Sequence, residues 1–190
     1  MQIVETIIPE VKVIIPKVFG DSRGYFFESW NAGAFADAGI NCSWVQDNES
    51  RSRKGVLRGL HYQTAPYTQA KLVRVIEGTV WDVVVDIRRN SPTFGRHVAM
   101  KLDAESKCQL FIPRGFAHGF VVLSESAVFA YKCDNFYMPS HERGIAFDDP
   151  ALGIDWHVEC KECILSDKDR RNPLFKDAEL LDCENKEPLQ

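Results

Sequence analysis

The stretch LVRVIEGTVWDVVVDI, residues 72–87, decides the fold class. It holds two apolar runs rich in β-branched residues, Leu72–Ile76 and Val80–Ile87, with Glu77-Gly78 between them. β-Branched residues favour strands, and glycine favours the tight turns that join strands. The stretch therefore predicts two consecutive strands connected by a short turn.

Apolar runs separated by turn residues continue in both directions along the chain. The other predicted strands are Val11–Ile15, Gly24–Trp30, Leu57–Gln63, His97–Leu102, Cys108–Ile112, Gly119–Leu123 and Val128–Cys133. Helical signals are few, because only Asn31–Ala38 and a single turn at Lys168–Arg171 fit a helix. Many short strands at this spacing predict an all-β sandwich or barrel with short peripheral helices.

Composition and charge narrow the class of protein. The 190 residues are 45% hydrophobic and 26% charged, which is enough for a substantial core. We expect one domain over residues 1–183 and a polar tail over residues 184–190. The formal net charge of −4 argues against nucleic acid as the main partner.

Hydropathy gives no sign of a membrane partner. No segment reaches the run of about 18 apolar residues that a membrane span needs. The N-terminus lacks a basic region, and Glu5 and Pro9 interrupt any apolar stretch that a secretory signal would use. We therefore expect a cytoplasmic protein.

The six cysteines are few and scattered for a chain of this length. Cys160 and Cys163, with His157 before them and Cys183 after them, could form a zinc site. A second CxxC pair, which would support such a site, is missing from the sequence. We expect thiols in a reducing compartment.

The nine residues GVLRGLHYQ, Gly55–Gln63, place Arg58 and His61 in an apolar run punctuated by glycine. Burying either group is costly unless it has a partner or a task. Histidine can also accept a proton near neutral pH. The run therefore suggests an anion-binding arginine beside a catalytic base. Taken alone, however, it favours a hydrogen-bonded core histidine and an arginine that snorkels to the surface.

Other segments place polar groups in or beside apolar strands. Lys71 opens one predicted strand, Tyr131 lies inside another, and His118 follows a Pro-Arg-Gly turn. Taken singly, each of these three is compatible with a solvated or packed side chain. Basic residues from distant segments, namely Arg23, Arg58, Lys168, Arg170 and Arg171, would suit a phosphate or diphosphate if they converge.

The chain resembles the dTDP-4-dehydrorhamnose 3,5-epimerase family from about Ile3 to Leu181. The segments that carry the resemblance are Gly20–Ser29, Gln46-Asp47-Asn48, Gly55–Gln63, Lys71–Asp86, Ile112–Leu123, Tyr131–Tyr137, Phe147–Pro150 and Leu165–Asp169. They occur in the family's order. The resemblance implies a cupin-type jelly roll, also called a double-stranded β-helix, that works as a homodimer without a metal or an organic cofactor.

The resemblance also implies a reaction and its residues. The substrate would be the nucleotide sugar dTDP-4-dehydro-6-deoxy-D-glucose, whose C4 ketone acidifies the protons at C3 and C5. His61 would abstract a proton with support from Asp169, and Lys71 would stabilise the enolate oxygen. Tyr131 would return a proton to the opposite face of the ring, giving dTDP-4-dehydro-L-rhamnose.

Further positions match the family's binding residues. Those implied for the nucleotide are Arg23, Glu28, Gln46, Asn48, Arg58 and Lys168, with Tyr137 stacking on thymine, while His118 and Glu142 would line the sugar pocket. One departure is Ala70, which replaces the family's usual glycine. Strict alternation would put Arg58 and His61 on opposite faces of a strand, so Gly59 is predicted to mark a bulge or twist.

Three alternatives remain at this level. An epimerase acting at C3 only, or at C5 only, would share the same catalytic residues. A metal-dependent cupin enzyme would leave His61 and His118 as ligands, fewer than the three that a catalytic metal normally takes. A non-catalytic sugar-nucleotide-binding jelly roll would explain the arginines and aromatic residues but not the combination of His61, Lys71, Tyr131 and Asp169.

Overall fold

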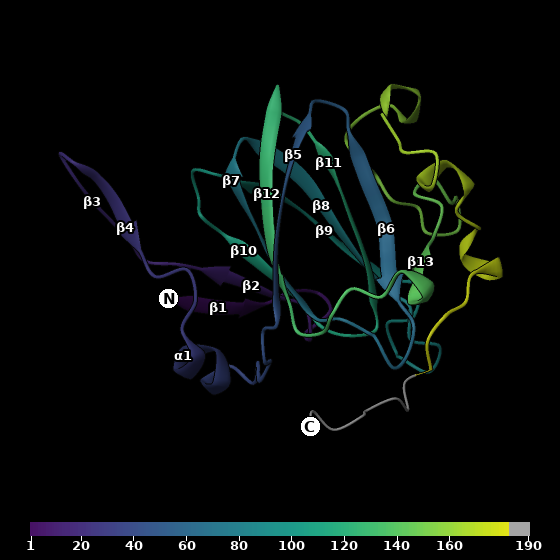
Figure 1. Cartoon of the computed structure of the whole chain (residues 1–190), viewed down its shortest axis with the longest axis horizontal. Coiled ribbons are helices and arrows are strands. Elements are labelled where there is room, and N and C mark those ends of the chain that lie inside the picture. The colour runs from purple at the N-terminus through teal and green to yellow at the C-terminus, as the bar shows by residue number, and fades with distance from the viewer. Residues whose placement is uncertain (183–190) are drawn as a thin grey trace.

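The computed structural model describes residues 1–182 and contains two antiparallel β-sheets packed face to face (Figure 1). The six-stranded sheet has the order β1 (Gln2–Glu5), β2 (Lys12–Ile15), β10 (Gln109–Ile112), β7 (Lys71–Glu77), β12 (Ser126–Cys133) and β5 (Gln46–Arg53). The five-stranded sheet has the order β13 (Glu142–Gly144), β6 (Leu57–Gln63), β11 (Phe116–Val122), β8 (Thr79–Asp86) and β9 (His97–Asp103). Because the chain crosses repeatedly between the sheets, the fold is the predicted cupin-type jelly roll.

Smaller elements surround the sandwich. A separate hairpin of β3 (Val18–Asp21) and β4 (Gly24–Phe27) projects from it, as Figure 1 shows at the left. The helix α1 (Ala32–Asp37) begins after Asn31, whose Oδ1 accepts a hydrogen bond from the Ala34 amide at 3.0 Å. The 3₁₀ turns are η1 (Pro139–His141), η2 (Cys160–Glu162), η3 (Asp169–Arg171) and η4 (Phe175–Asp177).

Burial on both faces of the sheets explains their apolar sequences. Along β8, Val84 belongs to the core between the two sheets, whereas Val83 and Val85 pack under the C-terminal segment that covers the outer face of the five-stranded sheet. On the outer face of the six-stranded sheet, Phe35 of α1 packs with Leu72. Strands buried on both faces read as continuous apolar runs, which is why residues 80–87 were informative.

The predicted strands are confirmed with small shifts at their ends, and Leu57–Gln63 matches β6 residue for residue. Within residues 1–182, four strands were not predicted: β1, β3, β5 and β13. The predicted helix and the turn near residue 170 correspond to α1 and η3. Within residues 1–182, no helix is long and apolar enough to cross a membrane. The predicted tail, 184–190, and Cys183 lie outside the described residues.

Candidate active site

The strand β6 contains the bulge that the sequence predicted at Gly59. In its pairing with β11, His61 lies opposite His118 and Arg58 lies opposite Phe120, so β6 has one extra residue between the two pairs. Gly59 adopts a φ of +129°, which side-chain-bearing residues rarely adopt. As a result Arg58 and His61 line the same cavity despite being three residues apart.

This cavity forms one part of a cleft between the two sheets. One hollow of about 390 Å³ adjoins another of about 340 Å³, and both are lined by His61, Lys71 and Tyr131. His61 comes from the five-stranded sheet, whereas Lys71 and Tyr131 come from the six-stranded sheet. The two sheets therefore bring the predicted acid–base residues together, and we call the joint space the central cleft.

His61 is held by a buried carboxylate. Its Nε2 lies 2.5 Å from Oδ1 of Asp169, whose side chain is 5% exposed. The Ser166 hydroxyl donates to the other carboxylate oxygen at 2.8 Å and accepts from the Asp169 amide at 3.1 Å. Burial raises the pKa of Asp169, but the hydrogen bonds from His61 and Ser166 outweigh it and lower the pKa. Asp169 is therefore ionised and fixes the imidazole ring.

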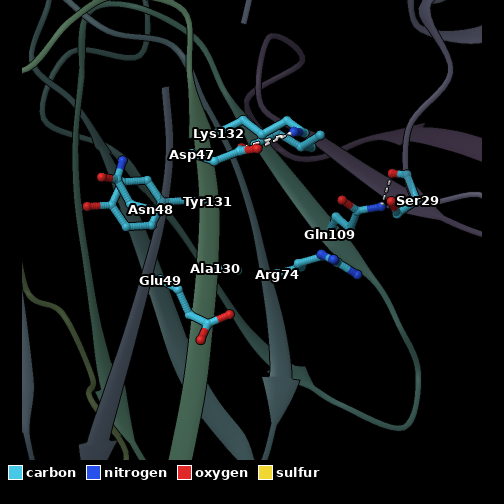
Figure 2. Close-up of a pocket in the computed structure, with 10 residues that line it drawn as sticks. Ser29, Asp47, Asn48, Glu49, Arg74, Gln109, Ala130, Tyr131 and Lys132 are labelled. Carbon is cyan, nitrogen blue, oxygen red and sulfur yellow. Dashed lines mark hydrogen bonds and ion pairs between the residues drawn. The ribbon is translucent and has the colours of Figure 1, made fainter. Parts of the chain in front are cut away.

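Lys71 and Tyr131 face the cleft from adjacent strands, and the Lys71 ammonium lies 5.9 Å from the centre of the Tyr131 ring. Burial lowers the pKa of Lys71 and raises that of Tyr131. Figure 2 shows the neighbouring hollow, where Tyr131 and Asn48 point to the opposite side of the strands from Asp47 and Lys132. Alternation along β12 and β5 thus directs Tyr131 and Asn48 inward.

Asp82 is a site residue that the sequence reasoning missed. It is fully buried, and its two oxygens lie 3.1 Å and 2.9 Å from Nε2 of His118. His118 lines the central cleft, so Asp82 orients it as Asp169 orients His61. A signal was available, because an acidic residue inside the apolar run Val80–Ile87 needs a buried partner.

The far side of the cleft carries a small polar network around Glu142. This carboxylate accepts from the Tyr137 hydroxyl at 2.5 Å and forms an ion pair with Lys168. Burial raises the pKa of Glu142. The bonds with Lys168 and Tyr137 outweigh this effect, so the pKa of Glu142 is lowered overall. The same hydrogen bond raises the pKa of Tyr137 to about 12. Three of the predicted binding residues therefore meet at one rim.

Known proteins are similar to this chain in sequence and in fold. A family model described as dTDP-4-dehydrorhamnose 3,5-epimerase matches residues 5–177. The chain belongs to this family. It is 56% identical to the dTDP-4-dehydrorhamnose 3,5-epimerase of Pseudomonas aeruginosa over 90% of this chain and 94% of the other. It is 54% identical to the dTDP-4-dehydrorhamnose 3,5-epimerase of Shigella flexneri, and the match covers 94% of this chain and 98% of the Shigella protein.

A solved structure is also similar to this member of the epimerase family. It is the dTDP-6-deoxy-D-glucose-3,5-epimerase of Legionella pneumophila in complex with dTDP-4-keto-L-rhamnose. The TM-score is 0.89 at 52% identity, and the match covers 92% of this chain and 93% of that chain. The jelly roll of this chain is therefore the fold of a known 3,5-epimerase.

The remaining predicted binding residues of this epimerase-family chain fall into two groups. Gln46 donates to Asn48 at 2.9 Å, and both line the cleft. Arg58 donates to the Ser52 hydroxyl at 3.1 Å. Arg23 and Glu28, by contrast, are not among the residues that line the cleft within residues 1–182. The β3–β4 hairpin instead holds Arg23 in an ion pair with Asp21, and its side chain is 88% exposed.

Of the cysteines within residues 1–182, Cys42, Cys108, Cys160 and Cys163 do not line the cleft. Cys133 lines the cleft, where the Asn48 amide donates to its sulfur at 3.8 Å. Arg170 and Arg171 do not join Lys168 among the lining residues of the described cleft. Among residues 1–182, no three metal-binding side chains gather closely enough to hold one ion.

Proposed function

We propose that this protein inverts C3 and C5 of dTDP-4-dehydro-6-deoxy-D-glucose and so forms dTDP-4-dehydro-L-rhamnose. The observation that carries the proposal is the His61–Asp169 pair, joined at 2.5 Å in the same cleft as Lys71 and Tyr131. A base, a cation and a hydroxyl acid around one cavity are the groups that epimerisation next to a ketone requires. Membership of the 3,5-epimerase family supports this assignment.

The proposed mechanism begins at His61. With Nε2–H donated to Asp169, Nδ1 accepts the proton from C3. The electrons of the C–H bond form a C3–C4 double bond, and the π electrons of the carbonyl move to the C4 oxygen. The Lys71 ammonium stabilises the negative charge of the resulting enolate. The Tyr131 hydroxyl donates a proton to the opposite face of C3, the ketone re-forms, and solvent restores both side chains. The same sequence at C5 completes the reaction, and the substrate's own ketone serves as the electron sink.

The nucleotide and the sugar have separate binding residues in this proposal. We assign Arg58 and Lys168 to the diphosphate, because charge-assisted hydrogen bonds suit phosphate oxygens. Tyr137, which is exposed at the rim, stacks on thymine. His118 and Glu142 line the sugar pocket, and Gln46 and Asn48 contribute amide hydrogen bonds on the nucleotide side.

Incorporation of deuterium tests the reaction. The protein is incubated with the dTDP-4-keto sugar in deuterated water, and the label is followed by NMR. We expect label at both C3 and C5. Label at one carbon would indicate a mono-epimerase, and no exchange would contradict the catalytic assignment. His61→Ala should abolish exchange while dTDP binding is retained, and Tyr131→Phe should impair completed epimerisation more than the initial loss of the substrate proton.

We also propose a homodimer in which the β3–β4 hairpin completes the partner's cleft. The hairpin exposes Phe19, Tyr25 and Phe26 at 53%, 61% and 69%, and such a patch on a projecting element marks an interaction site. A twofold arrangement would let each hairpin reach the other subunit. Arg23 and Glu28 would then act on the substrate bound by the partner.

Mixed dimers test this arrangement. Arg23→Ala and His61→Ala should each be nearly inactive alone. If Arg23 serves the partner's cleft, a heterodimer of the two variants has one cleft with both intact residues, so mixing should restore activity. A monomer in light scattering, or no restoration in a verified heterodimer, would contradict the proposal.

The cytoplasm is the compartment that we propose. Cys42, Cys108, Cys133, Cys160 and Cys163 are all free thiols, which fits a reducing environment. Fractionation of the producing cells should recover the activity with cytoplasmic markers, and recovery with an extracytoplasmic fraction would contradict it.

A further inference from the structure

Gly144 makes an unusually close approach to the segment that carries Asp169. It is the last residue of β13 and lies opposite His61 in the pairing with β6. A Cβ atom built on Gly144 would lie 2.5 Å from both Cγ and Nδ2 of Asn172. Real Cβ atoms do not come this close to other atoms. The Asn172 amide group therefore occupies the space that a side chain at position 144 would need.

Asn172 belongs to the same short turn as the carboxylate that holds His61. It directly follows η3, and its backbone N–H donates to the Asp169 carbonyl at 3.4 Å. The next residue is also fixed, because the Pro173 carbonyl accepts from the Ala146 amide at 2.8 Å. The turn is thus closed by the bond from Asn172 to Asp169, and just after Asn172 it is attached to the segment that follows β13.

The contact at Gly144 depends on shape rather than on hydrogen bonding by the amide nitrogen. Asn172 Nδ2 is buried and has no hydrogen-bond partner within residues 1–182. An unpaired buried donor is unfavourable, so this nitrogen does not by itself hold the side chain in place. The fit against Gly144 and the backbone bonds of the turn account for its position.

We propose that Gly144 and Asn172 form a size-matched seat that positions Asp169, and through it the His61 base. Asn172 is then a positioning residue. The inference rests on the proposed role of His61. A displacement of η3 by a few tenths of an ångström would change the 2.5 Å contact between Asp169 and the imidazole without touching the substrate. Catalysis should be affected while nucleotide binding is retained.

Gly144→Ala tests the seat directly. Gly144 does not have a left-handed φ, so alanine fits its backbone, and the nearest atoms that its methyl group meets all belong to the Asn172 side chain. Because a misplaced catalytic group can cost up to about 100-fold, we expect kcat to fall by about 10- to 100-fold with KM and dTDP affinity changed less than about threefold. Adding Asn172→Ala makes room for the new methyl group, and the double variant should regain most of the lost kcat.

Three controls separate this seat from general damage. Gly33→Ala, whose Cβ would meet its nearest atom at 3.4 Å, should keep wild-type activity. Asn172→Ala alone only removes contacts, and it should lower kcat by about threefold at unchanged KM because Asp169 is less firmly held. The downfield NMR signal of the His61–Asp169 proton should shift in Gly144→Ala and return in the double variant.

Several results would overturn the proposal. They are an unchanged kcat in Gly144→Ala, an equal loss in the single and double variants, or a parallel loss of kcat, dTDP affinity and folding stability. If Gly144→Ala does not fold, an unchanged kcat in Asn172→Ala would overturn the proposal instead. Failure of the proposed base is a separate outcome, because His61→Ala would then retain deuterium exchange.

Discussion

Single charged side chains determine the chemistry of the central cleft, and Lys71 has the most demanding position. Its ammonium lies in the central cleft, 5.9 Å from the centre of the Tyr131 ring, and burial lowers its pKa from the ordinary value of 10.5. A partly desolvated cation stabilises a developing enolate more strongly than a solvated one. The same burial makes its charge sensitive to alkaline pH.

Lys71→Arg tests this charge. The lysine must be protonated to stabilise the enolate, and with a lowered pKa it loses its proton as pH rises toward 10.5, so kcat/KM should fall over that range. Guanidinium stays protonated there. We expect Lys71→Arg to have a kcat reduced about tenfold because its geometry differs, but an alkaline fall displaced to higher pH.

Measuring kcat/KM against pH for both proteins checks this expectation. Lys132→Arg is the matched control, because Lys132 is on the outer face of the same sheet in an ion pair with Asp47, and its profile should not move. An alkaline fall at the same pH in Lys71→Arg and wild type would assign it to another group.

At the residue scale, sequence reasoning found one member of each histidine–carboxylate pair more easily than the other. His61 and His118 stood out because ionisable groups interrupt apolar runs. Asp169 lies in a polar segment near the C-terminus, so only the family resemblance identified it. Asp82 was visible in its run but was not connected to His118, because residues 36 positions apart meet only through the pairing of β8 with β11.

At the element scale, β6 shows how a local irregularity produces a functional surface. A regular strand would turn Arg58 away from His61. The extra residue at Gly59 brings both to the cleft, and the close approach of β11 leaves no room for a side chain there, since a Cβ on Gly59 would lie 2.5 Å from the Gly119 Cα. The same Cβ would lie 2.8 Å from the His118 carbonyl oxygen, and both of these neighbours are backbone atoms that cannot move aside.

Gly59→Ala should therefore be strongly destabilising. The substitution combines an unfavourable φ with an overlap against backbone, and we expect it to lower the free energy of unfolding by about 3 kcal/mol or more. Urea denaturation measures the loss. Gly39→Ala separates the two causes, because Gly39 has a φ of +78° but no atom within 4 Å of its Cβ position, and it should lose only about 1 kcal/mol. Equal losses in both variants would show that the approach to Gly119 does not matter.

The strand that sequence reasoning missed most completely is β5. Its sequence, QDNESRSR, has no apolar residue, yet it pairs along its whole length with β12. β5 is an edge strand whose inward side chains line a polar cleft instead of the core, so the usual apolar signal is absent. The apolar strands were predictable because burial determines their composition, whereas β5 is determined by its pairing and by the site.

At the scale of the whole molecule, the two sheets must stay in register for the cleft to exist, because each contributes part of it. One buried ion-pair network joins several distant segments at the end of β8. The Asp86 carboxylate, fully buried, accepts from Arg88 at 2.7 and 2.8 Å, and from the hydroxyls of Ser91 and Thr93 at 2.5 and 2.6 Å. Arg88 also pairs with Glu10 near the N-terminus.

The Arg88 guanidinium additionally lies 4.5 Å from the centre of the Phe116 ring on β11, so this network connects the N-terminal segment with two central strands. Removing the charge of Asp86 would leave the guanidinium without its main partner. Breaking a buried pair in this way is costly, and we expect Asp86→Asn to lower the free energy of unfolding by about 3 kcal/mol at neutral pH. We propose that residues 1–183 unfold as one domain, so a single transition should move to lower urea.

The pH dependence of that loss provides the sharper test. Burial raises the pKa of Asp86, but its hydrogen bonds outweigh burial and hold the pKa below the ordinary value of 3.8. A lowered pKa contributes stability that is present above pH 3.8 and is lost as pH falls through the folded-state value. Wild type should therefore lose this contribution in acid. The difference in the free energy of unfolding between wild type and Asp86→Asn should then narrow below about pH 4.

Asp47→Asn is the control, because Asp47 forms an exposed ion pair with Lys132, and its loss should cost under about 0.5 kcal/mol at neutral pH. A gap that stays constant from neutral pH into acid would mean that packing, and not the charge of Asp86, holds these segments together.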